Sequence, residues 1–193
     1  MSRRRQRKRR HPIRRFIIIL TAAALLVCVL CQTVFVVEKK IYPLEYGAEV
    51  EKAARDYDLD EELIYAVINT ESHFDADACS GAGAKGLMQL MPSTFEWLQS
   101  LRGEQYDENS LFYPDINIDY GCYLLRYLLD KFGSEETAVA AYNAGFSIVE
   151  EWLGNPEYSQ DGVTLSSIPY PETEEYVKKV ESAKEKYKKL YNR

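Results

Sequence analysis

The sequence predicts an all-α protein, in which one apolar helix near the N-terminus precedes a helical domain. Three observations support this fold class: an uncharged run at residues 16–37, helix start and stop signals along residues 48–191, and apolar residues that recur at steps of three and four. With 46% apolar and 12% aromatic residues among 193, the chain can fill one packed core and carry a short appendage.

The basic residues are concentrated at one end of the chain. Residues 1–15 contain nine lysines and arginines and no acid, which leaves 15 basic residues against 30 acidic ones in the remainder. A body with a formal charge of about −15 repels nucleic acid, and we expect no nucleic-acid partner.

Residues 16–37 are the predicted transmembrane anchor. These 22 uncharged residues would span roughly 33 Å as a helix, which is enough to cross the apolar core of a bilayer. By the positive-inside rule, residues 1–15 form a basic cytoplasmic tail and the domain lies outside the cytoplasm, so the cell membrane is an expected partner. A cleaved signal peptide is the alternative, because Ala22, Ala23 and Ala24 could form a peptidase site, although apolar residues continue for thirteen positions beyond them.

The four cysteines fall into two pairs. Cys28 and Cys31 lie inside the apolar run, where we interpret their spacing as membrane packing rather than a redox or zinc motif. Cys79 and Cys122 lie in the exported part, where a disulfide and two buried free thiols both remain open.

The expected organisation is a linker at residues 38–47 and a folded domain at residues 48–193, with helices near 48–56, 60–72, 93–101, 115–131, 135–143, 147–153 and 171–191. The helix start signals, Asp or Ser followed three positions later by Glu, are Asp58 with Glu61, Ser93 with Glu96, and Ser147 with Glu150. The stop signals are Gly103, Gly133, Gly145 and Gly154. Residues 155–169 lack periodicity and predict a surface loop.

Glu71 is the candidate residue for acid–base chemistry. It continues the apolar stripe of its helix, three residues past Ile68 and four past Val67. Burial and the negative end of the helix dipole both favour the neutral acid, and holding it protonated near pH 7 requires a pKa rise of roughly two to three units, about 3 to 4 kcal/mol. The alternatives are a structural ion pair and a solvated helix end. The only histidines are His11 and His73, so no metal-ligand cluster is expected.

Four blocks of the chain occur in a fixed order, and they read "INTESHFDADACSGAGAKGLMQLMPST", "PDINIDYGCYLLRYL", "AVAAYNAG" and "IPYPETEEYV". Together they resemble the catalytic domain of the soluble lytic transglycosylases, relatives of goose-type lysozyme, over about residues 48–188. The resemblance implies a lysozyme-like helical domain with a long saccharide groove, peptidoglycan glycan strands as the substrate, and Glu71 as the catalytic residue.

The same resemblance implies a set of residues that line the groove. These are Ser72, Met88, Gln89, Tyr142, Asn143 and Tyr176. The amides of Gln89 and Asn143 can donate to and accept from the polar groups of amino sugars, while the tyrosines offer an apolar face with a polar tip. Ordinary core packing is the alternative for both tyrosines.

The resemblance also implies a mechanism with one carboxylate. Glu71 would protonate the oxygen that links N-acetylmuramic acid to N-acetylglucosamine, then take the proton of the muramic acid 6-hydroxyl as a 1,6-anhydro sugar forms, with no metal or organic cofactor. One alternative is a muramidase-type hydrolase in which Asp75 or Asp77 positions a water, and another is a non-catalytic wall-binding or assembly protein. The sequence leaves open whether the chain works with cell-wall or secretion machinery.

Overall fold

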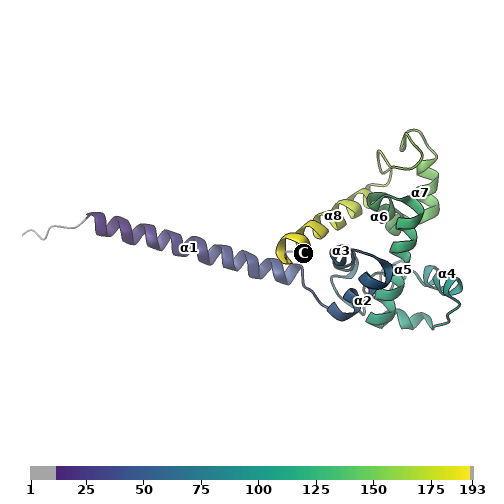
Figure 1. The fold of residues 1–193 in the computed structure, drawn as a ribbon, viewed down its shortest axis with the longest axis horizontal. Coiled ribbons are helices and arrows are strands. Elements are labelled where there is room, and N and C mark those ends of the chain that lie inside the picture. The colour runs from purple at the N-terminus through teal and green to yellow at the C-terminus, as the bar shows by residue number, and fades with distance from the viewer. Residues whose placement is uncertain (1–11, 192–193) are drawn as a thin grey trace, which may run out of the picture. The chain divides into compact units, whose positions relative to one another are not determined.

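The computed structural model describes residues 12–191, and the first eleven residues of the predicted basic tail lie outside this range. The chain divides into two compact units, Met1–Pro43 and Leu44–Arg193 (Figure 1). We call the second unit the helical domain.

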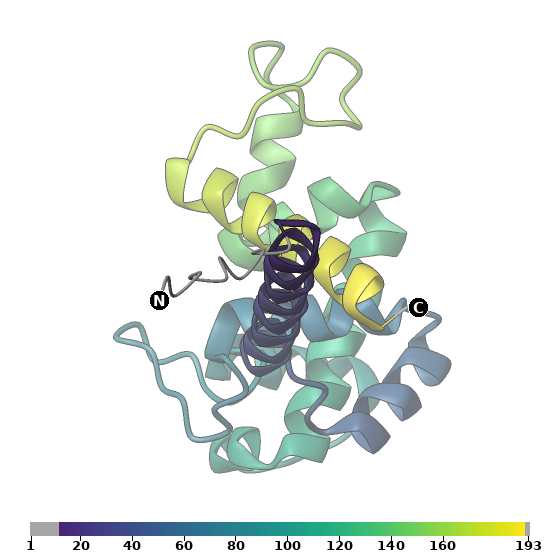
Figure 2. The ribbon, with the colours of Figure 1, turned by 90° about the vertical axis from the view of Figure 1, so that its left-hand side faces the viewer.

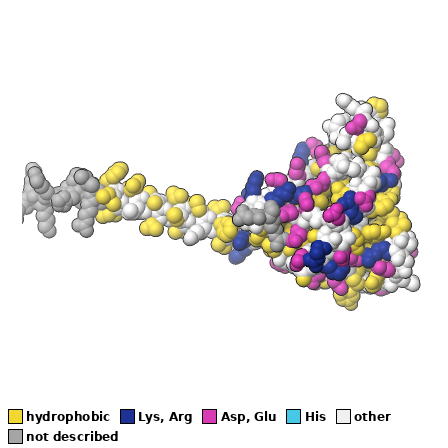
Figure 3. Space-filling model, in the orientation of Figure 1, with side chains coloured by type: hydrophobic (Ala, Val, Ile, Leu, Met, Phe, Trp, Pro, Cys, Tyr) yellow, Lys and Arg dark blue, Asp and Glu magenta, His cyan; other side chains and the backbone are white. Residues whose placement is uncertain are grey.

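The first unit contains one long helix, α1 (Pro12–Ile41). Every side chain from residue 16 to residue 37 is exposed, and most of the helix surface is hydrophobic or uncharged, whereas acidic and basic side chains are scattered over the helical domain (Figure 3). Within α1, the 26 residues Phe16–Ile41 are long and apolar enough to cross a membrane, with a mean hydropathy of 2.6. This finding fits both a retained anchor and a signal sequence. The helix also runs through the first residues of the expected linker.

The helical domain contains seven α-helices and one short 3-10 helix within its described residues. They are α2 (Gly47–Tyr57), α3 (Glu61–Ser72), α4 (Pro92–Arg102), η1 (Glu108–Phe112), α5 (Pro114–Phe132), α6 (Glu135–Ala144), α7 (Phe146–Leu153) and α8 (Pro171–Tyr191). The prediction of an all-α fold is therefore confirmed, and each predicted helix is present with ends within about two residues of those expected. The 3-10 helix was not predicted.

The predicted stop signals are correct, but the start signals are not. A glycine follows each of α4, α5, α6 and α7 as predicted. None of Asp58, Ser93 and Ser147 caps the start of a helix. The helix α4 begins one residue earlier at Pro92, whose fixed φ suits the first helical position and needs no capping acceptor. A side-chain cap does form at the start of α6, where the Ser134 hydroxyl oxygen accepts from Thr137 N.

Two central helices organise the packing of the domain. The helix α3 lies beside α8 and also contacts α2, while α5 contacts α2, α4, α6 and η1 (Figures 1 and 2). Residues 63–69 of α3 are buried without interruption, which explains why this helix is apolar on more than one face. The segment between α7 and α8 has neither helix nor strand, as predicted for residues 155–169.

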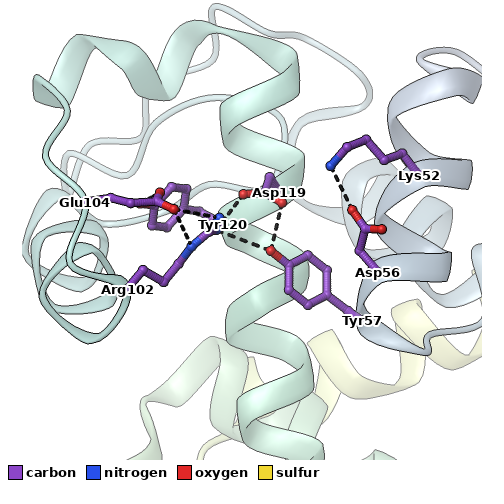
Figure 4. Close-up of polar contacts among 7 residues, drawn as sticks. All are labelled: Lys52, Asp56, Tyr57, Arg102, Glu104, Asp119 and Tyr120. Carbon is purple, nitrogen blue, oxygen red and sulfur yellow. Dashed lines mark hydrogen bonds and ion pairs between the residues drawn. The ribbon is translucent and has the colours of Figure 1, made fainter.

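A polar cluster fixes the end of α4 to its neighbours (Figure 4). The guanidinium of Arg102 donates to Asp119 on α5 and to Glu104, and it lies 4.6 Å from the centre of the Tyr120 ring. The hydroxyl of Tyr57, the last residue of α2, donates to Asp119 at 2.7 Å, and that of Tyr120 donates to Glu104 at 2.6 Å. These bonds satisfy the partly buried charges and join α2, α4 and α5.

Candidate active site

Glu71 is the penultimate residue of α3. The helix ends because His73 and Phe74 both adopt left-handed conformations, with φ of 53° and 65°, and the chain turns away from the helix axis. Phe74 is buried and His73 is exposed. Glu71 therefore remains on the buried side of the last turn, with its side chain only partly accessible to solvent.

Burial raises the pKa of Glu71 to about 7. A smaller effect in the opposite direction comes from Tyr176 on α8, whose hydroxyl donates to Glu71 Oε1 at 2.7 Å and stabilises the carboxylate. No other charged group contributes to this shift, and Glu71 forms no ion pair among the described residues. A carboxyl with this pKa can both give and take a proton at neutral pH.

Tyr142 and Met88 join α6 to the loop between α3 and α4. The Tyr142 hydroxyl donates to the Met88 carbonyl at 2.8 Å, and burial together with the nearby Glu71 carboxyl raises the pKa of Tyr142 well above its usual value. The Met88 side chain is wholly buried, so it lies beneath the site rather than on its surface. The next residue of α6, Asn143, is exposed and accepts a hydrogen bond from Thr173 of α8 at 2.8 Å.

Gln89 and Ser72 have local hydrogen-bond partners. The Gln89 side chain donates to the carbonyls of Ala78 and Gly86, at 3.2 and 2.9 Å, which leaves its own amide oxygen facing no partner within the described residues. Gln89 also adopts a left-handed conformation, with a φ of 48°. The Ser72 hydroxyl donates to the Ile68 carbonyl one turn earlier in α3. Hydrogen bonds thus join α3 to α8 through Glu71 and Tyr176, α6 to α8 through Asn143 and Thr173, and α6 to the loop through Tyr142 and Met88. Gln89 and Ser72 bond within their own segments.

The loop that carries Met88 and Gln89 is held by a residue that sequence reasoning missed. Asn117 of α5 is wholly buried; its Oδ1 accepts from Met88 N at 2.7 Å, and its Nδ2 donates to the carbonyls of Lys85 and Leu111 at 2.9 and 2.8 Å. The sequence does carry a signal for this role, because Asn117 lies on the apolar face of its helix, four residues before Gly121, and a buried amide needs hydrogen-bond partners.

Two glycines allow this loop to lie against α5. A Cβ atom at Gly86, where φ is +76°, would come within 2.1 Å of the Leu111 carbonyl oxygen, and one at Gly121 would come within 2.3 Å of Met88 Sδ. A larger residue at Gly86 would have to displace backbone, and one at Gly121 would have to displace the Met88 side chain. Within the "GAGAKGLMQ" block, the close approach of the backbone thus requires glycine at Gly86, whereas a Cβ at Gly81 or Gly83 would meet no atom within 4 Å.

The remaining candidate residues form no hydrogen bond with Glu71 among the described residues. Asp75 and Asp77 are exposed, and Asp75 Oδ1 accepts from Asp77 N at 3.0 Å in a loop-capping bond. Cys79 is exposed and Cys122 is buried, and both are free thiols. Within residues 12–191, no group of three His, Cys, Asp or Glu side chains could hold a metal ion.

The fold is that of the lytic transglycosylases of known structure. An inactive mutant of lytic transglycosylase Slt from Pseudomonas aeruginosa superposes with a TM-score of 0.68 at 32% identity, and the 70 kDa soluble lytic transglycosylase from Escherichia coli with a TM-score of 0.69 at 28% identity. Each alignment covers 78% of this chain and 25% of the compared chain.

The chain belongs to the family described as the Transglycosylase SLT domain, whose sequence model matches residues 49–162. A soluble lytic murein transglycosylase from Salmonella typhimurium is 35% identical over 143 residues, and a membrane-bound lytic murein transglycosylase C from Histophilus somni is 31% identical over 168 residues. The alignments cover 72% and 74% of this chain, but only 22% and 46% of these relatives. The resemblance predicted from the four sequence blocks is confirmed.

Proposed function

We propose that this chain is a membrane-anchored peptidoglycan lytic transglycosylase that cleaves the β-1,4 bond between N-acetylmuramic acid and N-acetylglucosamine and forms 1,6-anhydro-N-acetylmuramic acid. The observation that carries the proposal is the Glu71 carboxyl, which burial brings to a pKa of about 7 and which one tyrosine hydroxyl holds in place. Relatives named as murein transglycosylases, with shared fold and sequence, support the substrate class.

Glu71 acts first as an acid and then as a base. In its neutral form it gives its proton to the glycosidic oxygen while the bond from that oxygen to C1 of muramic acid breaks, and the sugar's own acetamido group stabilises the positive charge at C1. The Glu71 carboxylate then takes the proton of the 6-hydroxyl as that oxygen bonds to C1, so no water is consumed. A pKa near 7 suits both steps, because neither form is strongly favoured at neutral pH.

A one-carboxylate mechanism agrees with the surroundings of Glu71. Retaining and inverting glycosidases place a second carboxylate within about 5 to 9.5 Å of the first. Asp75 and Asp77 are the nearest acids in the chain downstream, yet both are exposed and neither affects the pKa of Glu71. An internal hydroxyl has a very high effective molarity and needs no second acid to activate it.

The amide and phenol groups around Glu71 are the proposed saccharide contacts. Asn143 is exposed beside Tyr142, and the Gln89 amide oxygen remains available to accept from a sugar hydroxyl or N–H group. The Tyr176 hydroxyl supports the carboxylate that forms after the first step. In this proposal Ser72 and Met88 lie next to the saccharide contacts. Met88 contributes through its backbone, whose N–H donates to Asn117 and whose carbonyl accepts from Tyr142.

The proposed location is the cell membrane, with the N-terminus cytoplasmic and the helical domain outside. The apolar length of Phe16–Ile41 supports a span, and the cluster of basic residues at 1–15 favours its orientation. Peptidoglycan lies on that side of the membrane, within reach of a domain attached to it.

Digestion of purified peptidoglycan tests the function. The full chain in detergent is expected to release muropeptides that end in the anhydro sugar, each lighter by one water than the hydrolysis product in a mass spectrum. Glu71→Gln should reduce the release by roughly 10²- to 10⁴-fold, whereas Glu62→Gln, the same change in the first turn of α3, should retain it.

The alternatives predict different products. If the parent protein releases reducing muramic acid ends, and this product disappears in Asp75→Asn or Asp77→Asn, the chain is a hydrolase. Glycan binding that is the same for the parent and Glu71→Gln, with no soluble product from either, would indicate a wall-binding protein.

A further inference from the structure

A buried hydroxyl lies directly behind the exposed amide of Asn143. Thr173 is the third residue of α8 and is 2% exposed, and its Oγ1 donates to Asn143 Oδ1 at 2.8 Å. Tyr176 follows Thr173 by three residues on the same face of α8 and binds Glu71. Asn143 follows Tyr142, whose pKa the Glu71 carboxyl raises. Asn143 and Glu71 are therefore each bound by a residue of α8, Thr173 and Tyr176, and these two residues lie one turn apart on the same face of that helix.

The direction of this hydrogen bond fixes the orientation of the amide. If the Asn143 NH₂ group faced Thr173, the hydroxyl would accept instead, and the bond that its proton makes to Asn143 Oδ1 would be lost. Leaving a buried hydroxyl proton unpaired is costly, so the observed donation is the stable arrangement. The first turn of α8 also carries a positive partial charge, which favours the amide oxygen on this side. The NH₂ group of Asn143 is thereby directed away from α8.

We propose that Thr173 is a positioning residue, which holds Asn143 so that its NH₂ group recognises the acetamido carbonyl oxygen of a bound amino sugar. This inference rests on the proposed function. A hydroxyl group on the sugar could adapt to either face of the amide, but a carbonyl oxygen accepts only and pairs with a fixed donor. A sugar that has lost its acetyl group presents an ammonium, which donates only and repels the NH₂ group. This contact therefore adds to the preference for N-acetylated strands that the part of the acetamido group in the proposed mechanism already creates.

The first experiment compares two substitutions of Thr173 in the full chain, with kcat and KM measured on N-acetylated and chemically N-deacetylated peptidoglycan. Thr173→Val keeps the shape and loses the hydroxyl, and we expect its KM on the acetylated strands to rise roughly 3- to 10-fold with a smaller change in kcat. Its preference for acetylated strands should fall by the same factor. Thr173→Ser keeps the donor and should restore both values.

Thr137→Val is the matched control. Thr137 is also the third residue of its helix, α6, and is 1% exposed, but the hydroxyl that bonds to Asn143 is that of Thr173. This variant should keep the parent preference. A thermal melt of each variant separates a loss of fold from a loss of recognition.

Asn143→Asp provides a test that does not depend on a buried substitution. The exposed aspartate can still accept from Thr173 with one oxygen, and it presents an acceptor in place of the donor. We expect the preference to shift toward deacetylated strands.

An unchanged preference in either Thr173→Val or Asn143→Asp overturns the inference, while the proposed function stands as long as Glu71→Gln abolishes anhydro product. If Glu71→Gln retains turnover, the proposed function itself fails.

Discussion

The pKa of Glu71, which burial and Tyr176 set, should make the activity of the protein depend on pH. The acid must be protonated before bond cleavage, so kcat/KM should fall as pH rises through about 7. The Tyr176 hydroxyl lowers the pKa of Glu71, and its loss in Tyr176→Phe should raise that pKa. We expect the basic limb of the pH profile to move upward by roughly half to one unit.

The matched control for this shift is Tyr187→Phe. Tyr187 also lies on α8, and its hydroxyl accepts from Asn69 at 3.1 Å rather than contacting Glu71. This variant should leave the limb in place even if the domain becomes less stable. A limb that stays at the parent pH in Tyr176→Phe would mean that the hydroxyl does not control the titration.

The same carboxyl should lower the stability of the domain at neutral pH. Its folded pKa of about 7 lies above the usual value of 4.5, so its contribution to stability is fully present below pH 4.5 and is lost as pH rises through 7. The total loss is up to about 3 kcal/mol. Glu71→Gln has no such loss, because an amide stays neutral and can still accept from Tyr176.

Urea unfolding of the parent and Glu71→Gln between pH 4 and pH 8 checks this prediction. The free energy of unfolding of the variant should increase relative to the parent as pH rises, by about 2 to 3 kcal/mol across the range. Two parallel curves would show that Glu71 has an ordinary pKa in the folded state, and the acid–base role would lose its physical basis.

At the scale of elements, the loop between α3 and α4 depends on α5. Asn117→Ala removes three hydrogen bonds and leaves Met88 N and the carbonyls of Lys85 and Leu111 without their buried partner. We expect a loss of about 2 to 4 kcal/mol in unfolding free energy, together with a loss of activity, because the loop carries Met88 and Gln89. Asn109→Ala, a change at an exposed position of η1, should cost less than about 1 kcal/mol.

The activity of Asn117→Ala at low temperature separates two explanations. If the variant is folded at that temperature and inactive, the loop conformation is needed for function. Full activity in a folded variant would show that the site tolerates a displaced loop, contrary to the close contact of Gly86 with Leu111.

The helices were predictable because their signals are local. Apolar steps of three and four identified α3 to α7 within about two residues, and a following glycine marked the ends of α4 to α7. The register of Glu71 beside Ile68 predicted its partial burial. The starts were less predictable. An Asp or Ser near a helix start predicts a cap, but Pro92 and Gly145 set the starts of α4 and α7 instead.

The contacts that complete the site are not local, and the sequence alone did not identify them. Asn117 acts on Met88, 29 residues away, and Thr173 acts on Asn143, 30 residues away. An asparagine or a threonine in a predicted helix does not by itself indicate a bond to a distant residue. Tyr176 was predicted from the family resemblance, but its bond to Glu71 spans 105 residues and required the packing of α3 on α8.

At the scale of the whole molecule, the chain combines two units whose surfaces differ in polarity. The side chains of residues 16–37 are exposed and apolar, which in water is a large unfavourable surface and in a bilayer is not. The helical domain is acidic and has its own buried core. We therefore expect the domain to stay soluble without α1, and α1 to control where the protein is found.

Cell fractionation of the full chain and of residues 44–193 tests this division. The full chain should remain with membranes after a high-salt wash and enter solution only with detergent, because salt screens charge but leaves apolar contacts intact. Residues 44–193 should be soluble and should release the same anhydro muropeptides. The intact mass of the membrane-bound protein then distinguishes the two readings of Phe16–Ile41. A mass that includes the apolar helix supports a retained anchor, whereas a soluble product cut after the Ala22 to Ala24 cluster would show that the segment is a signal sequence.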